Sequence, residues 1–390
     1  MPEQPVPSVY VVYYHATHLD PKNLKDDSLY TIHAFPVTHP PYEPLPQEPV
    51  LTLRPRDLPF LMGFACIGSS IYMIGGRWDW PSPRRDPSLD VYILDTRLLP
   101  PPTSHPIENP LHYLRKGPSL RAPKIDPTVI SLLGKVYVLP NSFDPSSSDK
   151  DEPRAEVLDP CSNEWVSLPE PKLDPCDDLE PSAYKVRSCN SIGSCIVLTL
   201  FCDLVYELDC NHPCEGWKKS SRFAWLPELQ QTSGSDVVDG LWYPWFPFPS
   251  HLKKGACLVA CDLAQRKEDQ PPEVILVCHT RSGKIGSKIY SGHRRVVDIG
   301  CGQAVIFSCG FSKCTDLMAH GYGKLRFTFD VVRLEKKTSA DERKRKHRGD
   351  PKARFINCVL LRSFSCVIEE VGPGGDLCGC FLVHRPPSFL

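Results

Sequence analysis

The chain has 390 residues, of which 41% are hydrophobic and 23% are charged, and its formal net charge is −1. This length allows one large domain or two domains of ordinary size. The balanced charge excludes an electrostatic field of the whole chain that would attract nucleic acid or membranes. Proline is enriched, because 42 of the 390 residues exceed twice the usual share of roughly 5%. Prolines scattered between apolar runs predict an all-β fold of short strands, since proline breaks helix interiors.

The first predicted strands are three short apolar runs, at residues 8–14, 28–35 and 50–53. A hairpin follows, because the apolar runs at residues 60–67 and 71–76 flank a turn at Gly68. Residues 90–95 supply a third strand before a proline-rich connection.

The clearest unit of the chain is residues 130–169. Two apolar runs flank a turn at Gly134, a third run ends at Asp159, and a fourth carries Trp165. This order predicts one four-stranded antiparallel unit. In the next unit we expect residues 182–187 and 192–200 to form the first hairpin.

The hairpin units recur along the chain, with turn glycines at Gly68, Gly134, Gly193, Gly240 and Gly302. Their intervals are 66, 59, 47 and 62 residues. The predicted third strands end at a second series of residues, Asp95, Asp159, Asp209 and Asp262, at intervals of 64, 50 and 53 residues. A repeat of about 50 residues is typical of propeller blades, which stack around an axis because one four-stranded blade cannot bury both faces.

Two units carry a family resemblance. The first ends its second strand in Gly75-Gly76 and its third in Asp95, and the second combines Gly134-Lys135 with Trp165. In these motifs the chain resembles kelch-repeat proteins, in the style of divergent plant members. The resemblance implies a protein-recognition module in protein turnover or signalling. No F-box is visible ahead of the first strand, so we expect any ligase contact to be made through another protein.

We predict a single kelch-like β-propeller over residues 1–390, with six four-stranded blades. The runs at residues 366–371 and 379–383 are expected to join the N-terminal strands in one blade, because such closure hides the edges of the sheets. A basic loop is expected over residues 334–354.

The loops between the second and third strands of the blades are predicted to share one face. Long loops often carry function, and two of these are rich in the aromatic and arginine side chains that dominate interfaces. The predicted protein-binding residues are Trp78, Trp80, Arg84, Arg85, Trp242, Tyr243, Trp245 and Phe246. The alternative is that these aromatic rings fold inward and only fill local gaps.

The 18 cysteines are expected to be reduced, because residues 1–7 show no secretory signal. This favours a cytosolic or nuclear protein without a membrane span. The segment Cys210-Asn211-His212-Pro213-Cys214 is interpreted as a turn and not as a zinc site. Strand alternation predicts that the thiols of Cys378 and Cys380 share one face.

The basic run at residues 343–348 leaves three interpretations open: a nuclear-import signal, a nucleic-acid patch or a solvated loop. No catalytic motif is visible, and the 13 histidines are dispersed. We therefore predict a non-enzymatic scaffold that binds an unidentified protein partner, without a cofactor and without nucleic acid. The alternative is a metal-dependent propeller oxidoreductase, since some kelch-type propellers are copper oxidases.

Overall fold

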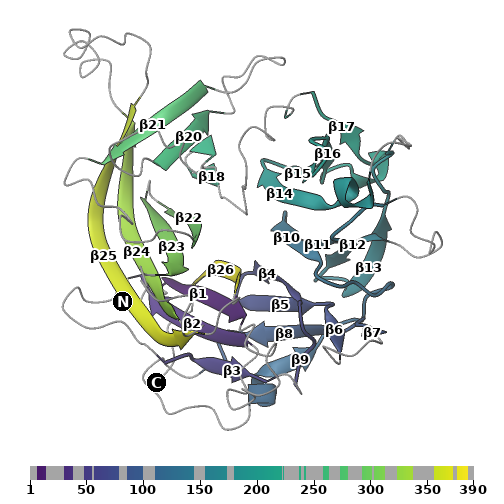
Figure 1. Ribbon diagram of the computed structural model, residues 1–390, viewed down its shortest axis with the longest axis horizontal. Coiled ribbons are helices and arrows are strands. Elements are labelled where there is room, and N and C mark those ends of the chain that lie inside the picture. Colours follow the sequence, from purple (N-terminus) through teal and green to yellow (C-terminus); the bar gives the residue numbers. More distant parts are fainter. Residues whose placement is uncertain are drawn as a thin grey trace.

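The protein is a β-propeller in the computed structural model (Figure 1). The structure describes residues 7–14, 30–37, 48–54, 57–78, 86–99, 110–144, 154–173, 180–221, 223, 237–238, 241–242, 258–262, 273–279, 292–300, 303–311, 323–336, 355–371 and 376–384. Its strands form five sheets of at least four strands, and we call these sheets blades one to five.

Blade one joins the two ends of the chain. Its strand order is β26-β1-β2-β3, with β26 (Asp376–His384), β1 (Pro7–Tyr14), β2 (Tyr30–Pro36) and β3 (Leu51–Leu53). β26 pairs antiparallel with β1 from Pro7–His384 to Tyr14–Asp376. The predicted sharing of one blade by both ends is therefore confirmed, although residues 366–371 belong to another sheet.

Blades two to four are four-stranded antiparallel sheets. Blade two contains β4 (Gly63–Ile67), β5 (Ser70–Ile74), β8 (Val91–Asp95) and β9 (Leu114–Lys116). Blade three contains β10 (Thr128–Leu132), β11 (Lys135–Leu139), β12 (Ala155–Asp159) and β13 (Glu164–Leu168). Blade four contains β14 (Val186–Ile192), β15 (Cys195–Leu200), β16 (Val205–Asp209) and β17 (Lys218–Lys219).

Short 3₁₀ helices connect some of these strands: η2 (Pro110–Tyr113), η3 (Pro181–Tyr184) and η4 (Pro213–Glu215). The helix η3 occupies the first half of residues 182–187, which were predicted as a strand. A proline at its first position favours this helical turn. The first strand of blade four therefore begins at Val186 and runs on to Ile192, so the hairpin turns at Gly193.

Blade five is an eight-stranded sheet. It contains β18 (Val237–Val238), β19 (Leu241–Trp242), β20 (Leu258–Asp262), β21 (Glu273–His279), β22 (Gly292–Gly300), β23 (Gln303–Phe311), β24 (Gly323–Lys336) and β25 (Phe355–Val371). The order β18-β19-β20-β21-β25-β24-β23-β22 places β21 beside β25, and these two strands pair in parallel.

The predicted number of six blades is wrong, because the structure has five. Two four-stranded antiparallel runs, β18–β21 and β22–β25, were expected to be separate blades. Hydrogen bonding between β21 and β25 merges them, and residues 366–371 extend β25 to 17 residues. The end strands β18 and β22 lie next to each other near the centre of the ring (Figure 1).

The local turn chemistry matches the predicted units. Gly68, Gly134 and Gly193 all have the positive φ that a tight hairpin turn requires. Third strands end at Asp95, Asp159 and Asp209. In each case the carboxylate accepts a hydrogen bond from the backbone N–H two residues later, at 2.9 to 3.0 Å, which is an Asx turn.

Among the described residues, apolar clusters lie at four of the junctions between neighbouring blades. The cluster between blades five and one contains Phe307 and Val11, and the cluster between blades one and two contains Tyr30 and Ile71. The cluster between blades two and three contains Ile74. A fourth cluster lies between blades three and four. Alternating side chains on each strand supply the two faces of a blade, so most of the core lies between blades.

The thiols of Cys378 and Cys380 do not share a face. The register of β26 against β1 shifts between Val12 and Tyr13, so that Cys378 is an extra residue in β26. Cys380 lies in the cluster between blades five and one, whereas Cys378 packs against the cluster between blades one and two. The prediction failed because a β-bulge reverses the alternation locally.

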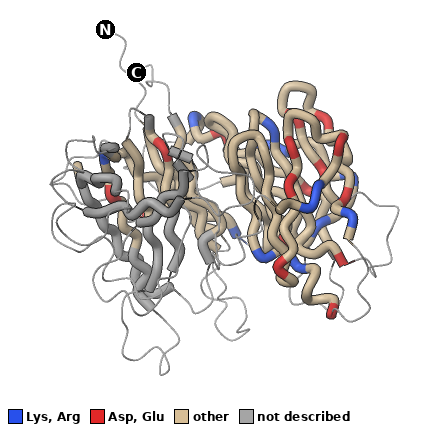
Figure 2. The backbone as a smooth tube through the Cα atoms, turned by 90° about the horizontal axis from the view of Figure 1, so that it is seen from above, with Lys and Arg blue, Asp and Glu red and all other residues tan. Residues whose placement is uncertain are grey.

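Charged residues of both signs are mixed over the described blades (Figure 2). This distribution agrees with the formal net charge of −1. Within the described residues, no helix has the length and apolar character needed to cross a membrane. The strand β24 extends to Lys336, and the rest of the predicted basic loop, including residues 343–348, lies outside the described residues.

Candidate interaction face

The long connection between β5 and β8 of blade two forms a two-stranded ribbon. β6 (Arg77–Trp78) pairs antiparallel with β7 (Asp86–Pro87). Backbone hydrogen bonds of 2.9 Å in both directions tie Arg77 to Phe60, which lies in the connection from blade one. The ribbon is thus attached to the body of the propeller at its base, and residues 79–85 connect its strands.

Gly75 and Gly76 allow the ribbon to leave the blade. Both have positive φ, of 69° and 89°. A Cβ on Gly75 would lie 2.6 Å from the Lys124 carbonyl oxygen, and one on Gly76 would lie 2.4 Å from the Phe60 carbonyl oxygen. Gly76 N–H donates to the Lys124 carbonyl at 2.7 Å. The glycine pair therefore lets the chain pass between two connections of this face.

Trp78 lies at the base of the ribbon and is partly buried. Its indole N–H donates to Asp90 Oδ2 at 3.0 Å, and the Ser88 hydroxyl donates to the same oxygen at 3.0 Å. Lys116 Nζ lies 3.2 Å from Asp90 Oδ1. Partial burial raises the pKa of Asp90, but the hydrogen bonds from Trp78, Ser88 and Lys116 outweigh it and hold this pKa below its usual value.

The connection from blade three to blade four belongs to the same layer. Val186 N–H donates to the Asn141 carbonyl of the loop in blade three at 2.9 Å. On its other side, Phe201 N–H in the loop of blade four donates to the Lys185 carbonyl at 3.0 Å. In blades two to four, loops between second and third strands therefore lie beside the connections between blades, and backbone hydrogen bonds join them.

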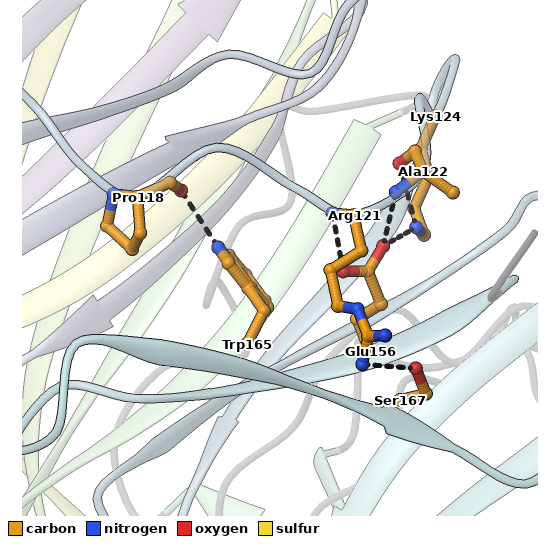
Figure 3. Close-up of polar contacts among 7 residues, drawn as sticks. All are labelled: Pro118, Arg121, Ala122, Lys124, Glu156, Trp165 and Ser167. Carbon is orange, nitrogen blue, oxygen red and sulfur yellow. Dashed lines mark hydrogen bonds and ion pairs between the residues drawn. The ribbon is translucent and has the colours of Figure 1, made fainter.

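A buried carboxylate fastens the connection between blades two and three (Figure 3). Glu156 in β12 accepts hydrogen bonds from Arg121 N–H at 2.8 Å and Ala122 N–H at 3.2 Å, and it forms an ion pair with Lys124. Lys124 Nζ also donates to the Ala122 carbonyl at 3.0 Å. The side chains of Glu156 and Lys124 are only 0% and 3% exposed, so both charges depend on these partners.

Trp165 adds a second attachment to the same connection. Its indole N–H donates to the Pro118 carbonyl at 2.8 Å, while its ring lies in the apolar cluster between blades two and three (Figure 3). The sequence indicated a tryptophan in the fourth strand of the unit. It gave no sign that Glu156 would be an acceptor for the backbone of the connection between the blades.

A further exposed cluster, which the sequence did not indicate, lies on this face at the short loop of blade four. Arg187 Nη2 donates to the Phe201 carbonyl at 2.9 Å, and its guanidinium also forms an ion pair with Asp203. The Arg187 guanidinium carbon lies 5.3 Å from the centroid of the Phe201 ring. The Phe201 residue is 53% exposed.

The described residues include only part of the predicted binding set. Trp78 is described with its side chain, and Trp242 lies in β19 without a described side chain. The remaining predicted residues lie outside the described residues: Trp80, Arg84, Arg85, Tyr243, Trp245 and Phe246. The residues of the ribbon tip therefore stay a prediction, whereas Trp78 has a defined place at the base.

A polar recess of about 220 Å³ lies on blade four, at the ends of β16 and β17. It is lined by Cys195, Glu207, Asp209, Glu215, Gly216 and Lys218. Among the described residues, no group of three His, Cys, Asp or Glu side chains is arranged to hold a metal ion. In the predicted turn at residues 210–214, Cys210 is buried and Cys214 is exposed, and η4 begins within the turn at Pro213.

No protein-family model and no curated protein matches this chain. Among solved structures, it is similar to the N-terminal domain of Nup159, with 9% identity, a TM-score of 0.35, and coverage of 78% of this chain and 62% of that one. It thus spans less than two thirds of that domain's length. It is also similar to YjhT, with 12% identity, a TM-score of 0.35, and coverage of 70% and 81%. A third similar structure is the computationally designed Ika8 protein, with 8% identity, a TM-score of 0.32, and coverage of 76% and 64%.

Proposed function

We propose that this β-propeller is a non-enzymatic protein-interaction scaffold of the kelch type, and that its partner binds the face formed by the loops between second and third strands. The ribbon β6–β7 carries this proposal. Attachment at Phe60 and Asp90 holds its base, and a fixed base lowers the entropic cost of binding at the tip.

The residue types of the tip suit a protein partner. Trp80, Arg84 and Arg85 lie between the two strands of the ribbon in the sequence. Tryptophan and arginine are enriched among the residues that contribute most to protein interfaces. In this proposal Trp242 of β19 and the residues Tyr243, Trp245 and Phe246 that follow it in the sequence supply a second group of contacts, while Trp78 supports the ribbon through Asp90.

A role as a recognition module in protein turnover or signalling, in the cytosol or nucleus, is part of the same proposal. It rests on the resemblance of Gly75-Gly76 and of the unit around Gly134 to kelch repeats. No observation on the described residues favours the alternative of a metal-dependent oxidoreductase. We therefore propose no catalytic step and no cofactor.

The test is partner capture by a triple variant, Trp80→Ala with Arg84→Ala and Arg85→Ala. Purified wild-type protein and variant are cross-linked in a cell extract, and bound proteins are compared by quantitative mass spectrometry. Truncating an interface anchor costs about 2 kcal/mol or more, which is roughly 30-fold in affinity. We expect the variant to lose the proteins that the wild type enriches, with its thermal unfolding unchanged.

The matched control is Arg345→Ala with Lys346→Ala. These residues lie between β24 and β25, which are the third and fourth strands of an antiparallel run, so their connection leaves from the opposite end of the strands. The control is expected to recover the same proteins as the wild type. Equal recovery by the folded triple variant would reject the ribbon tip as the binding site.

A further inference from the structure

The outer edge of blade three differs from the outer edges of the other four-stranded blades. β13 is the last strand in its sheet order and lies at the rim of the propeller (Figure 1). Lysine and other charged residues commonly keep an edge strand from pairing with another chain. The outer strands of blades two and four carry such residues, Arg115 and Lys116 in β9 and Lys218 and Lys219 in β17. In blade one the outer strand β3 has three residues and η2 lies next to it, whereas the five residues of β13 include neither lysine nor arginine.

The edge of β13 is accessible in the folded chain. Val166 is 55% exposed, and Glu164 and Ser167 are exposed on either side of it. Alternate residues of an edge strand direct their N–H and C=O groups away from the sheet. Among the described residues, no backbone hydrogen bond outside the sheet involves residues 164–168. The strand therefore offers a row of backbone donors and acceptors to another extended chain.

Contacts on its inner side hold β13 in position. All five of its residues pair with β12. Trp165 is buried in the cluster between blades two and three, and Leu168 is buried in the cluster between blades three and four. On the rim, Arg121 Nη1 donates to Ser167 Oγ at 2.9 Å. A strand that is already ordered lowers the entropic cost of adding another strand beside it.

The two ends of this edge differ in charge. The first end carries Glu164 and the ion pair of Asp159 with Lys135. Within the described part of the chain, the Glu164 carboxylate has no ion-pair partner. The second end carries Arg121 and the ion pair of Arg154 with Glu170. A basic residue of an added strand is therefore attracted to the first end and repelled from the second.

The strand is poorly suited to pairing with a second copy of itself. An antiparallel pair centred on Val166 would place Glu164 opposite Leu168 of the other copy, so that the carboxylate gains no cross-strand ion pair. A parallel pair in register would place the two Glu164 carboxylates opposite each other, which is destabilising. A segment of different sequence complements the edge better.

We propose that the edge of β13 binds an extended segment of a protein partner as an added antiparallel strand. The segment carries a β-branched residue opposite Val166 and a lysine or arginine opposite Glu164, since such cross-strand pairs stabilise a sheet. Antiparallel pairing is the more stable arrangement, so the β-branched residue precedes the basic residue by two positions in the segment. This site at the rim goes beyond the proposed function, because it is separate from the face that the loops form.

The test uses the purified full chain and two fluorescein-labelled peptides of identical composition. One contains Thr-Thr-Val-Thr-Lys between two glycine pairs, and the other contains the reverse order, Lys-Thr-Val-Thr-Thr. Fluorescence anisotropy measures their binding. We expect the first peptide to bind about threefold more tightly, because only this order places lysine opposite Glu164 in an antiparallel strand. Equal binding, preference for the reverse order, or no binding of the first peptide would overturn the proposal.

Methylation of the peptide backbone separates strand addition from binding through side chains alone. N-methyl groups on alternate residues remove the N–H donors from one edge of an extended peptide and leave the other edge intact. Two forms of the first peptide are methylated at the second and fourth or at the third and fifth of the five central residues. One form should bind at least about tenfold more weakly than the other, because it loses two hydrogen bonds to β13. Equal binding by the two forms rejects strand addition.

Variants of β13 locate the site. Val166→Lys places a lysine in the middle of the edge and should weaken binding of the first peptide about fivefold or more. Val166→Thr is the matched control, because it keeps a β-branched side chain and should bind within about twofold of the wild type. Glu164→Gln should remove the preference between the two peptide orders. Thermal unfolding shows that each variant is folded, and wild-type binding by folded Val166→Lys rejects the site.

The triple variant of the ribbon tip, with Trp80, Arg84 and Arg85 replaced by alanine, should bind both peptides as the wild type does. Loss of partner capture in that variant with unchanged peptide binding supports two separate surfaces. Failure of the rim site is therefore distinguishable from failure of the proposed face, which the capture experiment decides. Loss of peptide binding in the folded triple variant would contradict a site at β13.

Discussion

Two neighbouring connections between blades differ in how their backbone groups are hydrogen-bonded. One joins blade two to blade three, and the other joins blade three to blade four. The first passes through buried space, where Glu156 accepts hydrogen bonds from two of its backbone N–H groups and pairs with Lys124. In the second, the described residues 180–186 bond through their backbone to neighbouring loops, as between Val186 and Asn141. An apolar cluster packs the blades together in both places.

This difference explains why a charged side chain, Glu156, is buried at the first connection. Backbone N–H groups of a buried connection need acceptors, because an unsatisfied buried donor costs free energy. At the first connection the Leu89 and Ser88 carbonyls accept from Leu120 N–H at 3.0 Å and Lys124 N–H at 3.4 Å, and the Glu156 side chain is the acceptor for the N–H groups between them.

At the second connection the loops supply the Asn141 carbonyl as an acceptor and the N–H groups of Phe143, Phe201 and Cys202 as donors. An apolar cluster with Cys189 and Cys210 among its residues lies between the blades.

Glu156→Ala should have the largest effect on stability. It leaves Lys124 as a buried charge without its carboxylate and removes the acceptor of two backbone N–H groups. Breaking a buried pair in this way typically costs about 3–5 kcal/mol. The measurement is the free energy of unfolding from urea denaturation at neutral pH.

The control for this prediction is the double variant Lys124→Met with Glu156→Gln. The glutamine carbonyl can still accept a backbone hydrogen bond, and no buried charge remains, so we expect this protein to be at least ~1 kcal/mol more stable than Glu156→Ala. A loss below about 1 kcal/mol in Glu156→Ala would mean that the charge does not hold this connection.

Gly76→Ala should have the second largest effect. The new Cβ would meet the Phe60 carbonyl oxygen at 2.4 Å, and φ is 89°, so strain and backbone displacement together should cost about 2–4 kcal/mol. Gly134→Ala is the matched control, because φ is 73° but no atom lies within 4 Å of the new Cβ. It should cost about 1 kcal/mol. Equal losses in the two variants would show that φ alone matters at Gly76.

Trp78→Phe should lower stability by about 1 kcal/mol, because Asp90 loses one hydrogen-bond donor. The pKa of Asp90 is depressed in the folded protein. Its contribution to stability is therefore present above the unfolded pKa of about 4 and is lost as the pH falls through the folded pKa. The difference in unfolding free energy between wild type and variant should consequently shrink between pH 7 and acidic pH. A difference that is independent of pH would contradict a bond to the ionised carboxylate.

Thiol labelling probes the second junction without altering stability. Cys161 and Cys214 are exposed, whereas Cys189 and Cys210 are buried between blades three and four. Burial raises the pKa of the Cys210 thiol to about 11, which disfavours the reactive thiolate. Peptide mapping after iodoacetamide treatment should show modification of Cys161 and Cys214 in the native protein, and of Cys189 and Cys210 only after denaturation. Rapid native labelling of Cys189 would indicate that the blades separate.

The sequence by itself determined most hairpins and turns of the described blades, although the predicted strand at residues 182–187 is in part the helix η3. Positive φ at Gly68, Gly134 and Gly193 follows from residue type, as do the Asx turns after the third strands. These features are local, because a turn depends on a few adjacent residues. The sharing of blade one by both ends was also predictable, since an unpaired edge is unfavourable.

The tertiary structure alone decided which strands from distant parts of the chain meet. The parallel pairing of β21 with β25 reduced six expected blades to five. Bulges at Cys378 and Arg187 redirected two side chains, and Glu156 became the acceptor for a connection more than 30 residues away. None of these follows from turn chemistry or alternation, because register and partner depend on how separate strands pack, and a shift of one residue reverses the face of every side chain beyond it.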